Sequence, residues 1–337
     1  YGFSGKLSHV TDEFLGGSHD LQTGIQYTTI GNSTLTGPND VIRTFSVTGR
    51  QSTRTTQLPY YSGRNSATWG TYDDDTYRIG GVALNLGVRV DYSKGYYPSF
   101  PMLGVGGVPT GQMSAANHDV YNWVTASPRV GVNYKAREGT LVKGHYGRYN
   151  NALERDFADI VPSNTTIFTF NVDAAGNRSN FTSTPPSSFR VDPDRKNPYS
   201  DQFIAQVEQE LRQNLGLQVN YVYKRGDNYG GWEDIAGTYA TFPYVDNVGL
   251  ESSGQTFDLY RLTSPANNRI FLLTTPLGPD GRGLYSKYQG ATFMVTKRMS
   301  NNWQGVVSLV LWEAKGRIAS SARTAPHQAQ TSASGTF

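Results

Sequence analysis

The stretch from Val82 to Ser93, VALNLGVRVDYS, alternates strictly between apolar and polar side chains. Its even positions are all apolar or aromatic, and its odd positions include Arg89 and Asp91. Successive side chains of a β-strand point to opposite faces, so this strand presents one apolar face and one charged face. A soluble sandwich would bury the apolar face against a second sheet, whereas a membrane barrel would turn it towards lipid.

The same alternation recurs around residues 21–27, 124–135, 202–208 and 217–224. Ile204 and Val222 are exceptions on the polar faces, and the pattern over 289–312 is noisier. Helical periodicity is weak throughout, so the sequence predicts an all-β chain.

Short and long connections alternate between these strands. The short ones fall at 16–19, 80–81, 136–138, 212–214 and 300–302, and the long ones span roughly 31–66, 94–122, 150–198 and 227–280. Globular domains seldom carry several unstructured loops longer than about 12–15 residues. Outer-membrane barrels combine short periplasmic turns with long extracellular loops. The pattern predicts an antiparallel up-and-down transmembrane β-barrel, of which this chain supplies about ten strands in five hairpins.

Aromatic residues stand near both ends of the predicted strands. Tyr27, Tyr92 and Tyr223 lie at the long-loop ends, and Tyr77, Tyr134 and Trp303 at the short-turn ends. Two such girdles are expected where a barrel meets the two membrane surfaces.

Composition excludes several classes of protein. The 337 residues contain no cysteine, which rules out disulfides and thiolate zinc sites. A net charge of +3 without a basic block argues against nucleic acid as a partner. Mean hydropathy is −0.50 and no apolar run approaches the ~18 residues of a membrane helix.

No catalytic, cofactor or metal site is expected. The five histidines are scattered without ligand spacing, and no G-x-S-x-G motif is present. Asp73-Asp74-Asp75 lacks the ligand spacing of a calcium loop and is interpreted as a solvated strand end. We therefore expect that the chain is not an enzyme.

Tyr72 to Tyr92, YDDDTYRIGGVALNLGVRVDY, resembles a hairpin of TonB-dependent outer-membrane transporters. Segments that resemble the later strands of that family follow in the family's order: SPRVG at 127–131, GHYGRY at 144–149, NPYSDQ at 197–202, YQG at 288–290 and WEAKG at 312–316. Tyr77 stands where Trp is common, and Thr292 where many relatives place Glu. These motifs are most similar to those of the Oar-like branch.

The resemblance implies that residues 1–337 are part of one barrel domain of about twenty-two strands, with the plug domain and the remaining strands outside this chain. It implies import of a scarce solute across the outer membrane of a Gram-negative bacterium. The implied partners are outer-membrane lipid, the protein's own plug domain, the TonB energy-coupling complex and an unknown small solute or peptide. Two alternatives stay open: a non-transporting outer-membrane barrel for adhesion or assembly, and a soluble all-β carbohydrate-binding protein.

Two sets of residues are candidates for function. The inward-facing set lines a substrate path or packs the plug, and consists of Arg89, Asp91, Arg129, Asn133, Gln206, Glu208 and Lys224. The loop set, which stacks on a ligand or ties the loops together, consists of Tyr96, Tyr97, Phe100, Tyr229 and Trp232.

Overall fold

The structure is a computed structural model of the whole chain. It describes residues 1–36, 42–45, 52–57, 59–104, 107–151, 167–172, 178–184, 189–245, 254–265, 270–277, 281, 283–319 and 329–330. No helix in this described part is long and apolar enough to cross a membrane.

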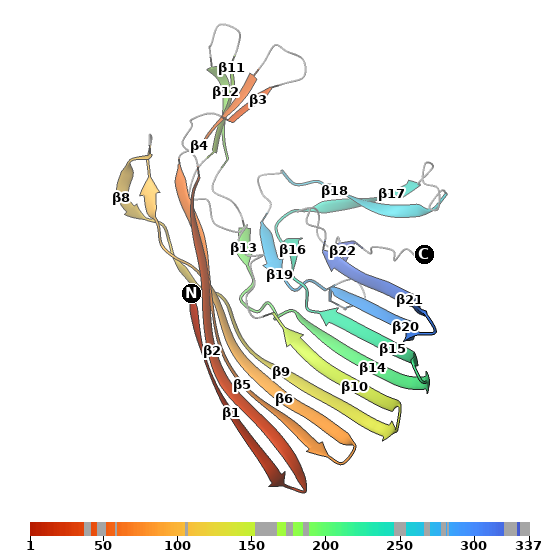
Figure 1. Ribbon diagram of the computed structural model, residues 1–337. Coiled ribbons are helices and arrows are strands. Elements are labelled where there is room, and N and C mark those ends of the chain that lie inside the picture. Colours follow the sequence, from red (N-terminus) through yellow and green to blue (C-terminus); the bar gives the residue numbers. More distant parts are fainter. Residues whose placement is uncertain are drawn as a thin grey trace.

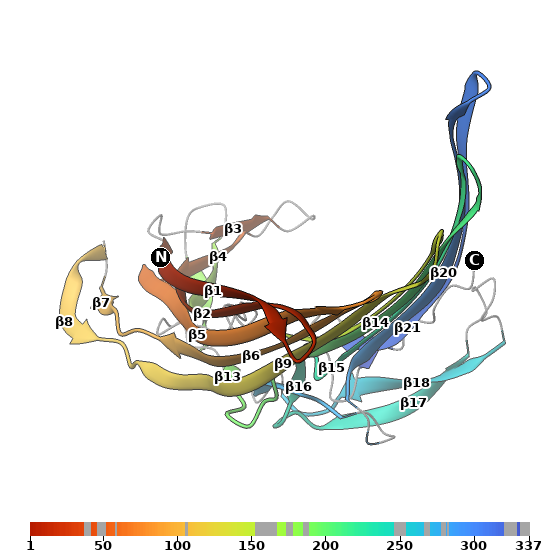
Figure 2. The ribbon, with the colours of Figure 1, turned by 60° about the horizontal axis from the view of Figure 1, so that its bottom comes forward.

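Ten long strands form one antiparallel sheet in which each strand pairs with the next long strand along the chain. They are β1 (Gly2–Phe14), β2 (Gly17–Thr36), β5 (Tyr60–Ile79), β6 (Val82–Tyr97), β9 (Asn117–Arg137), β10 (Thr140–Asn150), β14 (Tyr199–Arg212), β15 (Leu215–Asp227), β20 (Tyr285–Ser300) and β21 (Trp303–Ala319). The two-residue β22 (Ala329–Gln330) ends the sheet beside β21. Figures 1 and 2 show the strands side by side in a strongly curved, open sheet.

This sheet confirms the prediction of ten antiparallel strands in an up-and-down order. Several strands run further towards the long connections than predicted. β2 and β5 remain paired as far as Thr36 and Tyr60, and β6 continues to Tyr97. The sequence of these extensions lacks the apolar–polar alternation that predicts a strand. Their backbone N–H and C=O groups can still continue the hydrogen bonding between the strands.

The hairpins close through tight turns at the opposite end. Asn301 and Asn302 both adopt positive φ angles, 50° and 63°, as a two-residue type I′ turn requires. Asparagine tolerates this left-handed conformation better than most residues do. The third turn lies at Glu138–Gly139, at the end of the predicted 136–138 connection.

The apolar face of the sheet is open to the surroundings. Leu86, Val88 and Val90 of β6 are 41–48% exposed, and Val130 and Phe203 are similarly open. No second sheet covers this face within the described ranges, which argues against the soluble sandwich. We call it the outward face and the opposite one the inner face.

Outward aromatic side chains form rows across the strands, as the girdle prediction expects. Tyr27 pairs with Trp69, which pairs with Tyr92, near the long-loop end. Phe3 joins them, with its ring centroid 5.5 Å from that of Trp69. Near the turns, Tyr77 faces outward and stacks on His19 at 4.4 Å.

The interpretation of Asp73-Asp74-Asp75 as a strand end is wrong. All three residues lie within β5, several residues before its turn. Asp74 faces inward, opposite Gly87, whereas Asp73 and Asp75 face outward opposite Val88 and Leu86.

The long connections carry four smaller sheets. One contains β3 (Ile42–Phe45), β4 (Ser52–Gln57), β11 (Ile167–Val172) and β12 (Arg178–Thr184), and another contains β13 (Phe189–Val191), β16 (Gly231–Asp234) and β19 (Phe271–Thr274). The two remaining pairs are β7 (Pro101–Leu103) with β8 (Pro109–Met113), and β17 (Tyr239–Val245) with β18 (Thr256–Leu262). All four lie near the long-loop end of the main sheet (Figure 1).

Candidate functional site

The predicted inward-facing residues all lie on one face of the sheet. Cross-strand partners share a face, and Asn133 pairs with Lys143, which pairs with Gln206. Arg129 pairs with Gly147, which pairs with Gln202, and Gln202 with Lys224. The side chains predicted to share the inner face therefore do so in the observed strand register.

Arg89 and Asp91 of β6 form an ion pair on this face. The Arg89 Nε donates to both carboxylate oxygens at 2.9 and 2.8 Å, and Nη2 lies 2.7 Å from Oδ1. The Asp91 side chain is only 5% exposed. A charge-assisted, bidentate pair of this kind lies flat along the wall and fixes both side chains.

Lys143 and Glu208 form a second polar cluster on the inner face, nearer the hairpin turns. Lys143 Nζ lies 2.6 Å from Glu208 Oε1, and Gln206 Nε2 donates to the same oxygen at 2.5 Å. Both charged side chains remain more than one third exposed, so water screens the pair. The sequence prediction missed Lys143, although its position at the start of an alternating segment carried the signal.

Arg129 and Lys224 lie nearer the long-loop end. The Arg129 guanidinium carbon lies 5.2 Å from the centroid of the Tyr149 ring, an arrangement that supports a cation–π contact. Among the described residues, Lys224 has no ion-pair partner. Arg129 has none there either, so these two cations are the members of the predicted set that are free to attract an anion.

An apolar row interrupts this polar wall. Ile204 pairs with Val222, which pairs with Gly290, and Gly290 with Trp312. Tyr288 stacks on Trp312 above Gly290, with 6.4 Å between ring centroids. The exceptions in the sequence pattern thus lie together on the inner face, where an apolar row favours contact with a packed protein surface over contact with water.

Tyr97 and Trp232 of the loop set belong to one small core. Tyr97 is 6% exposed and clusters with the buried pair Tyr121 and Trp123, whose rings stack at 4.1 Å. Trp232 of β16 packs against this cluster. These two aromatics tie the β13–β19–β16 sheet to the inner face at the long-loop end.

Arg195 also connects the β13–β19–β16 sheet to the inner face. The Trp123 indole N–H donates to the Arg195 carbonyl at 2.8 Å, and the guanidinium lies 5.2 Å from the Trp123 ring. Thr274 of β19 donates to Asp192 at 2.5 Å. These contacts could not be predicted from the sequence, because Trp123, Arg195 and Thr274 come from three distant segments.

The remaining loop residues lie elsewhere. Tyr229 hydrogen-bonds Ser286 on the inner face at 2.8 Å. Tyr96 and Phe100 line a hollow of about 600 Å³, which also includes Asn32 and Asn65. Because Asn65 and Tyr96 pair on the outward face, this hollow and the buried core lie on opposite faces. The loop set therefore does not form one site.

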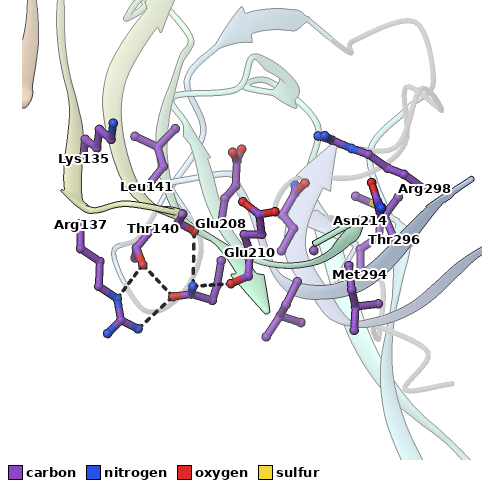
Figure 3. A pocket seen from close by; sticks show the side chains of 16 residues that line it. Lys135, Arg137, Thr140, Leu141, Glu208, Glu210, Asn214, Met294, Thr296 and Arg298 are labelled. Carbon is purple, nitrogen blue, oxygen red and sulfur yellow. Dashed lines mark hydrogen bonds between the residues drawn. The ribbon is translucent and has the colours of Figure 1, made fainter. Parts of the chain in front are cut away.

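A further hollow of about 510 Å³ lies at the short-turn end of the inner face (Figure 3). Glu208 and Glu210 line it together with Lys135 and Arg298. Arg137 and Thr140 both hydrogen-bond the Gln209 side chain at its edge. Mixed charges around an open hollow suit contact with a polypeptide better than enclosure of a small apolar solute.

Metal-binding geometry is not found in the described part of the chain. No group of three or more histidine and carboxylate side chains there is placed to hold a metal ion. Arg89, Asp91, Lys143 and Glu208 of the inner face form ion pairs instead.

Comparison with known proteins identifies a family. A family model described as “Outer membrane beta barrel domain” matches residues 6–311. A search of curated proteins gave no match.

The comparison with solved structures gave matches, of which the first described here shows the same fold. The outer membrane transporter YddB from Escherichia coli has a TM-score of 0.55 and 14% sequence identity, covering 94% of this chain and 33% of that chain. The FrpB iron transporter from Neisseria meningitidis (F3-3 variant) has a TM-score of 0.39 and 8% identity, covering 94% of this chain and 43% of that chain. The chain spans about a third of the length of YddB.

Proposed function

The chain belongs to the outer membrane beta barrel domain family, and we propose from this premise that it is part of the wall of a TonB-dependent transporter. In this proposal the whole protein imports a scarce solute across the outer membrane, where the family resides. The chain supplies wall and external loops and is not itself an enzyme. We assign it, on the sequence motifs, to the Oar-like branch.

The inner face is the observation that carries the proposal. Several of its polar side chains are paired with one another, as in Arg89–Asp91 and Lys143–Glu208. The apolar row from Ile204 to Trp312 lies on the same face, across β14, β15, β20 and β21. A wall that only enclosed water would leave that row exposed, whereas a plug domain inside the barrel would cover it.

The open sheet supports a barrel larger than this chain. β1 pairs only with β2 among the described strands, and β21 meets only the two-residue β22 beyond β20. Long unpaired edges promote pairing with other strands, and closure into a barrel removes them. The missing strands would supply the remainder of the wall.

Growth under nutrient limitation tests the import of a solute and its coupling to TonB. A strain with the full-length protein and a strain without it are grown with the limiting nutrient given as a ferric siderophore, a peptide mixture or an oligosaccharide. Each comparison is repeated in cells that lack TonB. We expect one nutrient class on which growth requires both proteins.

Two results would contradict the proposal. Equal growth of both strains on all three nutrient classes would argue against import. A growth difference that persists without TonB would argue against energy coupling and favour a passive barrel.

A further inference from the structure

The outward face of β5 is polar between its two aromatic residues, Tyr77 and Trp69. Three outward side chains lie between them, and they are Asp75, Asp73 and Thr71. Their cross-strand partners on β6 are all apolar. We call these three residues the outward polar stripe. Carboxylates on the lipid face of a barrel are unfavourable, so the stripe indicates contact with something other than lipid.

Asp73 lies at the centre of the apolar band. It stands four residues from Tyr77 and four from Trp69, which belong to the two aromatic girdles. With a rise of about 3.4 Å per residue and a tilt of about 40°, the strand between the girdles spans about 21 Å of depth, close to the ~25 Å apolar band of such barrels. The exposed Asp73 carboxylate is therefore far from both membrane surfaces.

The other two side chains of the stripe have partners within the chain. Thr71 Oγ1 donates to the Gly24 carbonyl at 3.2 Å, and Asp75 Oδ2 lies 2.7 Å from His19 Nδ1. Among the described residues, Asp73 forms neither an ion pair nor a side-chain hydrogen bond. Asp73 is thus the acceptor that the stripe leaves unused.

His9 of β1 is an unused donor on the same outward surface. It pairs with Leu21 of β2, which pairs with Asp75 of β5. Two strand spacings, about 10 Å, therefore separate β1 from the stripe. The exposed His9 ring has no hydrogen-bond or ion-pair partner within the described ranges. A donor and an acceptor thus lie on either side of β2.

A hollow of about 400 Å³ lies between them. Outward side chains of β1, β2 and β5 line it, and they are Leu7, His9, Leu21, Thr23, Asp73 and Asp75. The short Thr23 side chain stands between Leu7 and Asp73 in the ladder and leaves this space. The three strands lie side by side at one end of the sheet (Figure 1).

We propose that two copies of this chain associate through the outward surface of β1, β2 and β5, with His9 of each copy hydrogen-bonded to Asp73 of the other. A twofold interface presents the same patch on both copies, so the patch must be complementary to itself. This surface meets that requirement, because it carries one donor and one acceptor on opposite sides of a central strand.

The symmetry of a membrane favours this arrangement. Two copies with the same orientation in one membrane are related by a twofold axis along the membrane normal, which preserves depth. An axis beside β2 places β1 of one copy opposite β5 of the other. His9 then faces the stripe of the second copy, and the Leu21 side chains lie near the axis, beside the hollow.

Polar groups specify such a contact because apolar side chains gain little by leaving lipid. Lipid tails offer no donor to Asp73, whereas a second copy offers the His9 ring. In a separated copy the same carboxylate is exposed to lipid. This assignment concerns the outward face and does not rest on transport of any solute.

Disulfide cross-linking of the full-length protein in outer membranes tests the proposal. Any cysteine outside this chain is first replaced by serine, and Leu21→Cys is introduced as the reporter. Val130→Cys is the matched control, since Leu21 and Val130 lie in the same row of the outward face. Their exposures are also similar, 43% and 47%. Membranes are treated with a thiol oxidant, and the products are separated on a gel and identified by mass.

We expect Leu21→Cys to form a disulfide-linked species of twice the mass of the protein, and Val130→Cys to remain single. Adding Asp73→Leu or His9→Leu to the reporter should weaken association about tenfold or more, because either change removes two hydrogen bonds that involve a charged group. Leucine suits the lipid face, so both variants should still fold. His9→Asp combined with Asp73→His should restore the dimer, because the twofold axis exchanges the two positions.

Other results would overturn the assignment. Equal cross-linking of Leu21→Cys and Val130→Cys, whether weak or strong, would show that this surface does not associate specifically. An unchanged dimer yield with Asp73→Leu would show that the carboxylate takes no part. A product whose mass differs from twice that of the protein would assign the surface to a different partner. Failure of the exchanged pair to restore a dimer that both single variants lose would contradict the contact between His9 and Asp73.

Discussion

Gly70 lies directly opposite Asp91 in the ladder between β5 and β6, and its missing side chain makes room for the ion pair with Arg89. A Cβ atom at Gly70 would collide with both Arg89 Nη2 and Asp91 Oδ1. The pair therefore depends on a neighbouring strand as well as on the alternation in β6.

Gly70→Ala should destabilise the folded barrel by about 1–3 kcal/mol, because the added methyl group overpacks the ion pair. The measurement is the temperature at which the heat-modifiable band of the full-length protein converts on a gel. Gly5→Ala is the matched control, since a Cβ there meets only Ile25 at an ordinary 3.8 Å. An unchanged conversion temperature in Gly70→Ala would show that the pair can move aside at no cost.

An added charge should destabilise the barrel far more on the outward face of β14 than on its inner face. Val207→Arg should cost about 2–4 kcal/mol and lower the amount of folded protein, because Val207 faces lipid near the middle of the strand. Gln206→Arg should cost far less, since its side chain points to the polar inner face. The yield of heat-shifting protein in outer-membrane fractions compares the two. Equal losses would contradict the assignment of the faces.

Asp73 gives a third prediction, because it faces outward among apolar residues. Within the described ranges it has no ion-pair partner, whereas the neighbouring Asp75 pairs with His19 at 2.7 Å. Asp73→Leu should therefore raise the stability of the barrel, since a lone carboxylate on the lipid face is unfavourable.

Asp75→Leu is the comparison for that variant, and it should lower stability because it leaves His19 without its partner. Thermal conversion of the full-length protein, measured on the same gel, ranks both variants against the unaltered chain. If Asp73→Leu proves destabilising, then Asp73 contacts a polar group outside this chain.

The small sheet at the long-loop end gives a fourth prediction. Trp123→Phe removes the hydrogen bond to the Arg195 carbonyl, a loss of about 1 kcal/mol. Amide exchange should become faster in β13 and β19, because their attachment to the inner face weakens. Hydrogen–deuterium exchange with peptide resolution measures this effect. Trp69→Phe, on the outward face, should leave those segments unchanged, and a similar acceleration in both variants would point to general destabilisation.

Much of the fold was predictable from the sequence alone. Side-chain alternation depends only on strand geometry, so the segment from Val82 to Ser93 was sufficient to predict which of its residues face lipid. The short turns and long loops then predicted five hairpins and their order. The assignment of Arg89, Asp91 and Gln206 to one face needed no further information, because neighbouring strands of a barrel share their two faces.

Other features required the tertiary structure, because they depend on how separate strands align. The register between β10 and β14 brings Lys143 to Glu208, and that among β14, β15 and β20 places Ile204 beside Val222 and Gly290. No local pattern specifies these alignments. The loop aromatics show a similar limit, since residues 94–122 were predicted as a connection, whereas β6 continues to Tyr97 and places Tyr96 and Tyr97 on its opposite faces. The sequence by itself determined the faces, and the tertiary structure decided which residues meet on them, because alternation acts along one strand whereas contacts form across several.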